Sequence, residues 1–267
     1  MTGVIRTGIG GWTYEPWRGL FYPEKHPKAR ELEYASAHLR AIEINGTYYS
    51  TQKPATWADW AARVPDDFVF TVKASRFCTN RRVLAEAGES IAKFVNQGLA
   101  ELGPKLGPIL WQFMATKQFD PDDFGAFLKL LPKEVAGVPL RHAVEPRHES
   151  FRDPAFLAMA RAAGAAVVIA DDETHPQIAD VTADFVYARL QRQQDEVETG
   201  YPAEELGFWA ETAKGWAAGR EPDGLAYAAR GGAEKQPRDV FVFMINGAKR
   251  RAPAAAQSLQ GLVDRLG

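Results

Sequence analysis

Residues 41–49 read AIEINGTYY and residues 68–76 read FVFTVKASR. In both stretches apolar and polar side chains alternate with a period of two, which is typical of a β-strand with one buried apolar face. Glu43 lies on the polar face of the first stretch, and Lys73 lies on the polar face of the second. We therefore expect two strands whose charged residues point away from the helices that cover the apolar face.

Six further stretches of similar length are rich in β-formers and are separated by segments with helical patterns. The eight expected strands are 5–10, 41–45, 68–74, 109–113, 142–145, 166–171, 185–190 and 240–246. Such alternation is the signature of an α/β fold with a parallel sheet. Eight strands in 267 residues predict one TIM-barrel-like (β/α)8 domain over residues 1–267. A doubly wound open sheet is the rival, although no GxGxxG follows the first strand.

The helical segments have recognisable starts. Asp120-Pro121 and Asp153-Pro154 each place a capping acceptor before a proline that suits the first turn of a helix. A softer helical pattern covers Glu89–Leu102. Only residues 172–184 separate strands six and seven, so that crossover is expected to be abbreviated. Residues 220–238 are rich in glycine, proline and charge, and we expect them to form an inserted mobile loop.

The composition excludes several classes of protein. Lys and Arg total 32 and Asp and Glu total 34, so the net charge of −2 does not suggest a protein that coats DNA. One cysteine, Cys78, cannot form an intramolecular disulfide, which suits a reducing compartment. No apolar run approaches the roughly 18 residues of a membrane helix. We therefore expect a cytoplasmic protein that does not enter a membrane.

Polar side chains gather late in the expected strands, on the face that would line the barrel. In a TIM barrel this position is the mouth, where the loops after the strands build active sites. We predict catalytic roles for Glu43, Lys73, Glu145 and His148. We predict substrate-binding roles for Trp12, Asn45, Tyr48, Gln112, Arg147, Asp171, Arg189 and Asn246, with Gln112, Glu145, Asp171, Arg189 and Asn246 on the inward face.

These residue types point to acid/base chemistry on an anionic group. Glu43 and Glu145 could act as general base and acid, while Lys73, Arg147 and Arg189 bind a phosphate or carboxylate. A Schiff base at Lys73 needs a depressed pKa, and nearby acids are expected to keep this lysine charged. The competing explanation is that these acids and bases form a structural ion-pair network.

The cofactor is left open by the sequence. A divalent metal could recruit Glu43, Glu145, His148 and Asp171, which come from separate strands or strand ends. No HExxH or other diagnostic metal motif is present.

Several motifs together resemble the YecE-like family, DUF72. They are GGWxYxxW at 10–17, FYP at 21–23, EINxxYY at 43–49, FxVKASR at 70–76, LWQF at 110–113, ExRHxSF at 145–151, AD at 170–171 and ADFVYxRL at 183–190. The resemblance covers nearly the whole chain and implies a TIM-barrel-like fold without an assigned reaction. Gln191 stands where the family usually has histidine, and Asn246 where paired asparagines are common. The 220–238 insertion is longer than the family's usual connection.

The leading functional hypothesis is an enzyme of hydrolase or lyase type. Its substrate would be a small phosphorylated, sugar-containing or nucleotide-like anion. The first alternative is non-catalytic nucleic-acid binding through the basic run Lys249, Arg250 and Arg251. A metal hydrolase similar to barrel endonucleases that act at damaged DNA is a second alternative, which the resemblance suggests. The sequence leaves the substrate, the metal dependence and the oligomeric state open.

Overall fold

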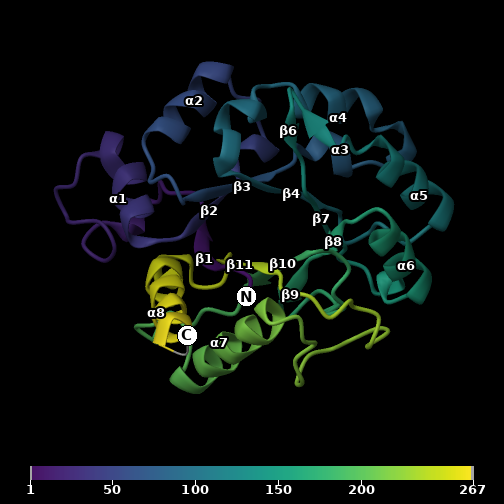
Figure 1. Cartoon of the computed structure of the whole chain (residues 1–267). Coiled ribbons are helices and arrows are strands. Elements are labelled where there is room, and N and C mark those ends of the chain that lie inside the picture. Colours follow the sequence, from purple (N-terminus) through teal and green to yellow (C-terminus); the bar gives the residue numbers. More distant parts are fainter. Residues whose placement is uncertain (1, 266–267) are drawn as a thin grey trace.

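Parallel strands form a closed barrel, and the main helices lie around its outside (Figure 1). The structure is a computed structural model that describes residues 2–265. The barrel strands are β1 (Ile5–Gly10), β2 (Ala41–Ile44), β3 (Val69–Lys73), β4 (Leu106–Gln112), β7 (His142–Glu145), β8 (Ala166–Val167), β9 (Ile169–Asp171), β10 (Phe185–Leu190) and β11 (Asp239–Met244). Eight strand positions were predicted, and the structure confirms a TIM-barrel-like fold.

The barrel closes at the sixth predicted strand. The sheet has the order β8-β7-β4-β3-β2-β1-β11-β10-β9, so its two ends are β8 and β9. These two strands flank Val168, whose N–H donates to the carbonyl of Val144 at 2.9 Å. The first half of the stretch pairs with β7 and the second half pairs with β10, both in parallel. One stretch of chain therefore joins the two edges that an open sheet would leave unpaired.

Alternation along the strands sorts the side chains into two cores. Ala41, Val69, Leu110, Ala143 and Phe241 belong to a small core inside the barrel. The residues next to them in sequence, such as the isoleucines of β2, pack in the larger core between sheet and helices. The lower barrel is filled with apolar side chains, so polar groups of the same inward rows meet only near the carboxyl ends of the strands.

The helices are α1 (Glu31–His38), α2 (Pro54–Ala62), α3 (Arg76–Thr79), α4 (Gly88–Val95), α5 (Pro121–Leu130), α6 (Pro154–Ala162), α7 (Ala203–Ala217) and α8 (Ala252–Arg265). Asp120 and Asp153 cap α5 and α6 as predicted. The predicted helix over Glu89–Leu102 is too long, because Gly98 has a φ of 119°. A side chain there would also meet Pro54 and Trp57, so this position requires glycine. After Gly98 the chain continues as 3-10 turns over Leu99–Lys105. An unpredicted hairpin joins β5 (Glu134–Val135) and β6 (Val138–Pro139).

Residues 172–184 contain no helix, as the abbreviated crossover predicted. The inserted segment 220–238, which also has no helix or strand, packs against this crossover. The buried carboxylate of Asp180 accepts hydrogen bonds from the N–H groups of Ala228 and Ala229 at 2.8 Å or less. Ala179 and Ala226 are joined by a backbone hydrogen bond of 3.0 Å. The segment expected to be a mobile loop is therefore anchored where a barrel would otherwise carry a helix.

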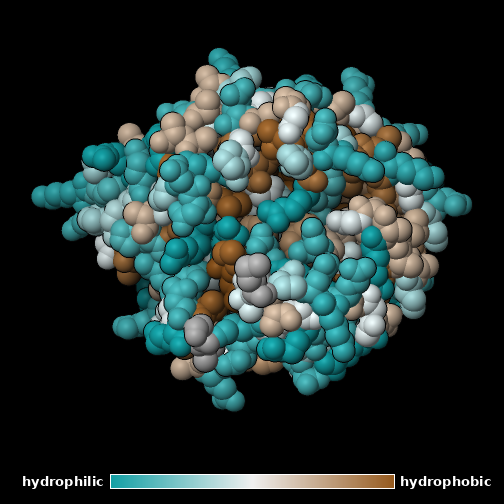
Figure 2. All heavy atoms as spheres, viewed as in Figure 1, coloured by the Kyte–Doolittle hydropathy of each residue, from teal (hydrophilic) through white to brown (hydrophobic). Residues whose placement is uncertain are grey.

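The face shown in Figure 2 is mostly hydrophilic, and hydrophobic residues appear there in small separate patches. Over residues 2–265, no helix combines the length and the apolar character that crossing a membrane requires.

Candidate active site

Arg189 lies in the upper barrel between two glutamates. Its Nη1 donates to both carboxylate oxygens of Glu145 at 2.9 and 2.7 Å. Its Nε and Nη2 donate to Glu43 at 3.2 and 3.1 Å. All three side chains are buried, with exposed fractions of 0% for Glu43, 1% for Glu145 and 2% for Arg189. The planar guanidinium therefore holds strands β2, β7 and β10 together through charge-assisted hydrogen bonds.

Further groups support each carboxylate. The Tyr187 hydroxyl donates to Glu43 at 2.6 Å and lies 2.9 Å from the Thr71 hydroxyl. Gln112 donates to Glu145 at 2.8 Å, and Arg147 adds two hydrogen bonds of 3.2 and 3.1 Å to one oxygen of that carboxylate. Tyr187 was not among the predicted site residues, although it precedes Arg189 by two positions and therefore shares its face.

The surroundings keep Glu145 and Arg189 ionised. Burial alone would raise the pKa of Glu145, but the Arg189 and Arg147 guanidiniums hold that pKa below its ordinary value. Burial opposes the charge of Arg189, yet Glu145 and Glu43 raise its pKa. Burial and the nearby Glu43 carboxylate raise the pKa of Tyr187 well above its ordinary value. The tyrosine therefore remains a hydrogen-bond donor at neutral pH.

Lys73 is the exception in this charged cluster. Within residues 2–265 its ammonium makes no side-chain hydrogen bond or ion pair, and it lies 4.4 Å from the centre of the Tyr48 ring. Burial lowers the pKa of Lys73 to about 8, and the positive Arg189 adds to the effect. Glu43 and Glu145 oppose this shift, as the sequence predicted, but they do not outweigh burial, so the pKa is depressed and Lys73 is still mainly protonated at pH 7.

The partly buried ammonium of Lys73 also predicts an effect on stability. Folded Lys73 releases its proton near pH 8, whereas the unfolded chain holds it to about pH 10.5. Between these values the unfolded chain binds more protons, so the free energy of unfolding rises with pH. We expect Lys73→Met to raise this free energy by about 1–3 kcal/mol at pH 7, and the gain should shrink by pH 10. Urea unfolding at both pH values measures this difference.

The exposed Lys53 supplies the control for this measurement. Lys53→Met should change stability by less than about 0.5 kcal/mol at either pH. If Lys73→Met has an unchanged or lower free energy of unfolding at pH 7, the charged ammonium of Lys73 does not destabilise the folded protein.

Comparison with known proteins agrees with this architecture. The sequence matches the family described as "Protein of unknown function DUF72" over residues 6–266. The chain belongs to the DUF72 family. It is 24% identical over 230 residues to the UPF0759 protein YunF of Bacillus subtilis (strain 168), covering 83% of this chain and 74% of that protein.

Solved structures show the same fold. A DUF72 family protein of Thermotoga maritima MSB8, TM1631, is 22% identical with a TM-score of 0.72, and the match covers 98% of each chain. A xylose isomerase-like TIM barrel fused to a 4-hydroxyphenylpyruvate dioxygenase is 14% identical with a TM-score of 0.51. That match covers 97% of this chain and 42% of the fusion. At such identities the likeness supports the barrel and no particular reaction.

The structure of this DUF72 protein contradicts the inward placement that was predicted for Asp171 and Asn246. Asp171 was expected in the barrel, but its register partner is Leu190, which packs in the outer core. Ala170 occupies the inward position opposite Arg189 instead. Asn246 was also expected inside, yet Ile245 belongs to the inner core. Strict alternation from the inner residues of these two strands predicts an outward position for both Asp171 and Asn246.

Asp171 and Asn246 instead belong to a second polar group beside the mouth. Asp171 lies 3.6 Å from Arg192 and accepts a hydrogen bond of 3.4 Å from the Tyr201 hydroxyl. Asn246, with a φ of 59°, donates to Gln191 at 2.7 Å. Burial raises the pKa of Asp171. Gln191, which directly follows β10, thus joins this strand to the end of β11.

The remaining predicted site residues surround the central network without joining it. The Tyr48 hydroxyl accepts a hydrogen bond from Asn80 at 2.9 Å, and Asn45 donates to the backbone of Glu43 at 3.4 Å. His148 caps a short turn, where its Nδ1 accepts from the N–H of Ser150 at 3.1 Å. Trp12 packs edge-on against Trp60 at a centroid distance of 5.1 Å. These contacts give Trp12 and His148 structural neighbours outside the central network.

The predicted metal ligands do not converge. Glu43 and Glu145 bind Arg189, while His148 and Asp171 have the separate partners described above. In the part of the chain that the structure describes, no three His, Cys, Asp or Glu side chains are placed to share a metal ion.

The predicted nucleic-acid surface is also engaged within the protein. Lys249 lies 4.5 Å from the centre of the Tyr14 ring. Arg250 forms an ion pair of 3.0 Å with Asp195, and Arg251 donates to the backbone of that residue at 2.8 Å. These cations are therefore less available to phosphates than the sequence suggested.

Proposed function

We propose that this DUF72 protein is an enzyme that performs acid/base chemistry of hydrolase or lyase type on a small anionic substrate. The substrate would bind at the mouth of the barrel, and Lys73 would exchange the proton. One observation carries this proposal. Lys73 is partly buried beside a fully paired Glu–Arg–Glu network, yet its ammonium has no counter-ion or acceptor within residues 2–265.

The proton-exchanging role follows from the pKa of Lys73, which is about 8. A lysine of this kind is neutral in an appreciable fraction of molecules near pH 7.5, so it can both accept and return a proton. Its neutral amine is also a nucleophile toward carbonyl carbon. Glu43 and Glu145, which the sequence predicts as general base and acid, are instead proposed to position Arg189. Their oxygens already accept hydrogen bonds from arginine, glutamine or tyrosine.

An anionic substrate suits the charge of the site. Lys73, Arg147 and Arg189 contribute three positive charges and Glu43 and Glu145 two negative ones, which gives 3 − 2 = +1. Arg147 is partly exposed, and its Nε and Nη2 bind Glu145 while Nη1 has no acceptor within the described residues. A phosphate or carboxylate could therefore meet Arg147 and Lys73 together, as guanidinium and ammonium groups commonly bind such anions. The Tyr48 ring borders the lysine and offers a face for stacking.

The test begins with a panel of sugar phosphates, nucleotides and carboxylate metabolites, followed by mass spectrometry of the products. Lys73→Met should reduce turnover of any substrate found by at least about 100-fold while binding changes less than tenfold. Lys53→Met should retain full turnover. Borohydride added during turnover would leave a mass adduct on Lys73 if the amine forms a Schiff base.

Two outcomes would contradict the proposal. Full turnover by Lys73→Met would remove the lysine from the chemistry. Salt-sensitive binding of nucleic acid without turnover, and unaffected by Lys73→Met, would favour the non-catalytic alternative.

A further inference from the structure

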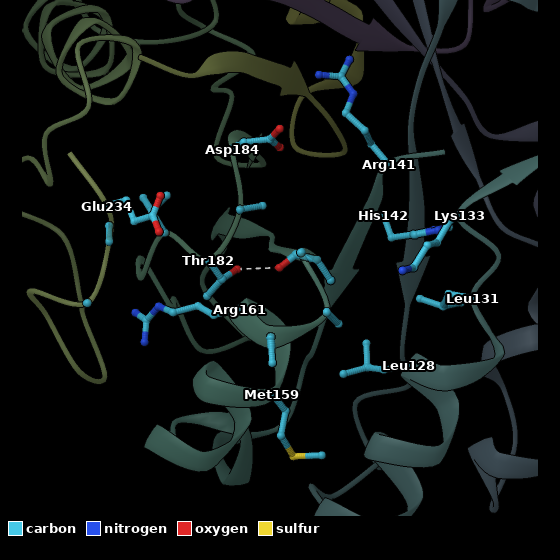
Figure 3. Close-up of a pocket in the computed structure, with 18 of the residues that line it drawn as sticks. Leu128, Leu131, Lys133, Arg141, His142, Met159, Arg161, Thr182, Asp184 and Glu234 are labelled. Carbon is cyan, nitrogen blue, oxygen red and sulfur yellow. Dashed lines mark hydrogen bonds between the residues drawn. The ribbon is translucent and has the colours of Figure 1, made fainter. Parts of the chain in front are cut away.

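A large cavity, whose lining is drawn in Figure 3, lies near the amino ends of several barrel strands. Its volume is about 1010 Å³, which is enough for a ligand the size of a nucleotide or a drug. Arg141 and His142 line it at the start of β7, Asp184 just before β10, and Arg238 just before β11. The Arg189 network lies toward the carboxyl ends of these strands, so the two places are separate.

The walls combine apolar side chains with the inserted segment. Leu128 of α5 and Leu131 just after it lie on one side in Figure 3, and Met159 of α6 lies at the bottom of the view. Gly232, Ala233, Glu234 and Gln236 of the insertion also line the cavity, and Figure 3 shows Glu234 on the side opposite the leucines. The inserted segment 220–238 thus forms part of the cavity.

The charged residues that line the cavity are mainly positive. The cations are Lys129, Lys133, Arg141, Arg161 and Arg238, and the acids are Asp184 and Glu234, which gives 5 − 2 = +3. Burial lowers the pKa of His142, so this lining residue remains neutral at pH 7. Such an excess of positive charge at a half-enclosed surface attracts anions.

Some of these cations have protein partners and others have none. Arg141 lies 3.4 Å from Asp239, and Arg238 donates to backbone carbonyls. Lys129, Lys133 and Arg161 make no side-chain hydrogen bond or ion pair within residues 2–265. Figure 3 shows Lys133 extending into the cavity and Arg161 on the opposite side, near Glu234.

Arg161 is the most unusual group in the lining. Its Nε and Nη2 are buried and have no hydrogen-bond partner. Gly232 lies directly against the guanidinium, because a Cβ at this glycine would come within 2.6 Å of Cζ. Buried N–H groups without an acceptor are costly, and an anionic oxygen is the strongest acceptor that could relieve the cost. A small movement of the insertion next to Gly232 would bring them into contact with a ligand.

We propose that this cavity binds a small organic anion with an apolar body. Arg161 holds the anionic group at the end formed by the insertion, the leucines and Met159 pack against the apolar body, and Lys133 supplies positive charge at the other end. The site is distinct from the mouth of the barrel and does not depend on the reaction proposed there.

The probe for this site is 8-anilinonaphthalene-1-sulfonate, which joins an aromatic body to one anionic group and becomes fluorescent when bound. We expect saturable binding to the folded protein. Arg161→Met should weaken it at least tenfold, and Lys133→Met should weaken it several-fold. The uncharged analogue N-phenyl-1-naphthylamine should bind at least tenfold more weakly. Lys73→Met, at the mouth, should bind the sulfonate within twofold of the original protein.

Two further measurements cover the case in which Arg161→Met folds poorly. Ala162 lines the cavity from the exposed end of α6, so Ala162→Trp should block the probe without disturbing the core. In the unchanged protein, saturating probe should slow amide hydrogen exchange in residues 231–236 and leave residues 73–76 unaffected. Equal binding of the uncharged analogue, or binding that survives both Arg161→Met and Ala162→Trp, would overturn the proposal. The proposal would also be overturned if Lys73→Met lost binding of the sulfonate while Arg161→Met and Ala162→Trp retained it.

Discussion

Arg189→Met is expected to lower the free energy of unfolding by about 3–5 kcal/mol. The substitution leaves two buried carboxylates, Glu43 and Glu145, without the guanidinium that contacts both at 3.2 Å or less. Removing one partner of a buried charge group exposes the full cost of burying the other. Urea unfolding at pH 7 measures the loss.

The pH dependence identifies the cause of that loss. In the original protein the pKa of Glu145 is held below its ordinary value, so its contribution to stability is present at neutral pH and disappears as the solution becomes acidic. Without Arg189, burial should raise this pKa, and protonation should then relieve the variant. The difference between the two proteins should therefore be smaller at pH 4.5 than at pH 7.

Two variants serve as controls for the arginine. Arg192→Met removes a half-exposed guanidinium that lies 3.6 Å from Asp171, and it should cost less than about 1 kcal/mol. Replacing Arg189, Glu43 and Glu145 together by Met, Leu and Leu should recover much of the stability lost in the single variant. A single variant as stable as the original protein, or a loss that does not change with pH, would contradict the role assigned to the network.

Asp180→Ala is expected to lower the free energy of unfolding by about 2–4 kcal/mol. The Asp180 carboxylate has an exposed fraction of 0% and accepts the N–H groups of Ala228 and Ala229. Truncation leaves both donors without this acceptor and frees the insertion from the crossover that it covers. Hydrogen exchange should show faster exchange at residues 226–229, and chemical unfolding gives the total loss.

Asp223→Ala is the matched control within the same insertion. Asp223 is exposed and pairs with Arg230 at 2.7 Å, so its loss should cost less than about 1 kcal/mol. If the two aspartates prove equally dispensable, the insertion is not anchored through Asp180.

The strand pattern accounts for how much of the barrel could be predicted. Local alternation placed five residues on the inward side of their strands: Glu43, Lys73, Gln112, Glu145 and Arg189. In the structure each of them lies on the same side of its strand as a residue of the inner core. The same reasoning failed for Asp171 and Asn246, because it followed their polar character at the strand end instead of the period of two.

Pairing across the barrel could not be obtained in this way. Arg189 meets a glutamate 146 residues away in sequence, and this contact requires the sheet to curve so that β2 and β10, which are separated by β1 and β11, come within reach of each other. Likewise, no local pattern indicated that residues 220–238 would pack on the 172–184 crossover or form one side of a cavity.

The sequence by itself determined the α/β class, the order of the strands and the identity of most charged side chains that face the barrel. These features follow from periodicity, which acts between residues only a few positions apart. Only the tertiary structure decided which charges neutralise one another and which remain without a partner. Burial and distance set those outcomes, and both arise when strands far apart in the chain are brought together. For that reason Lys73 differs from its charged neighbours only in the folded protein.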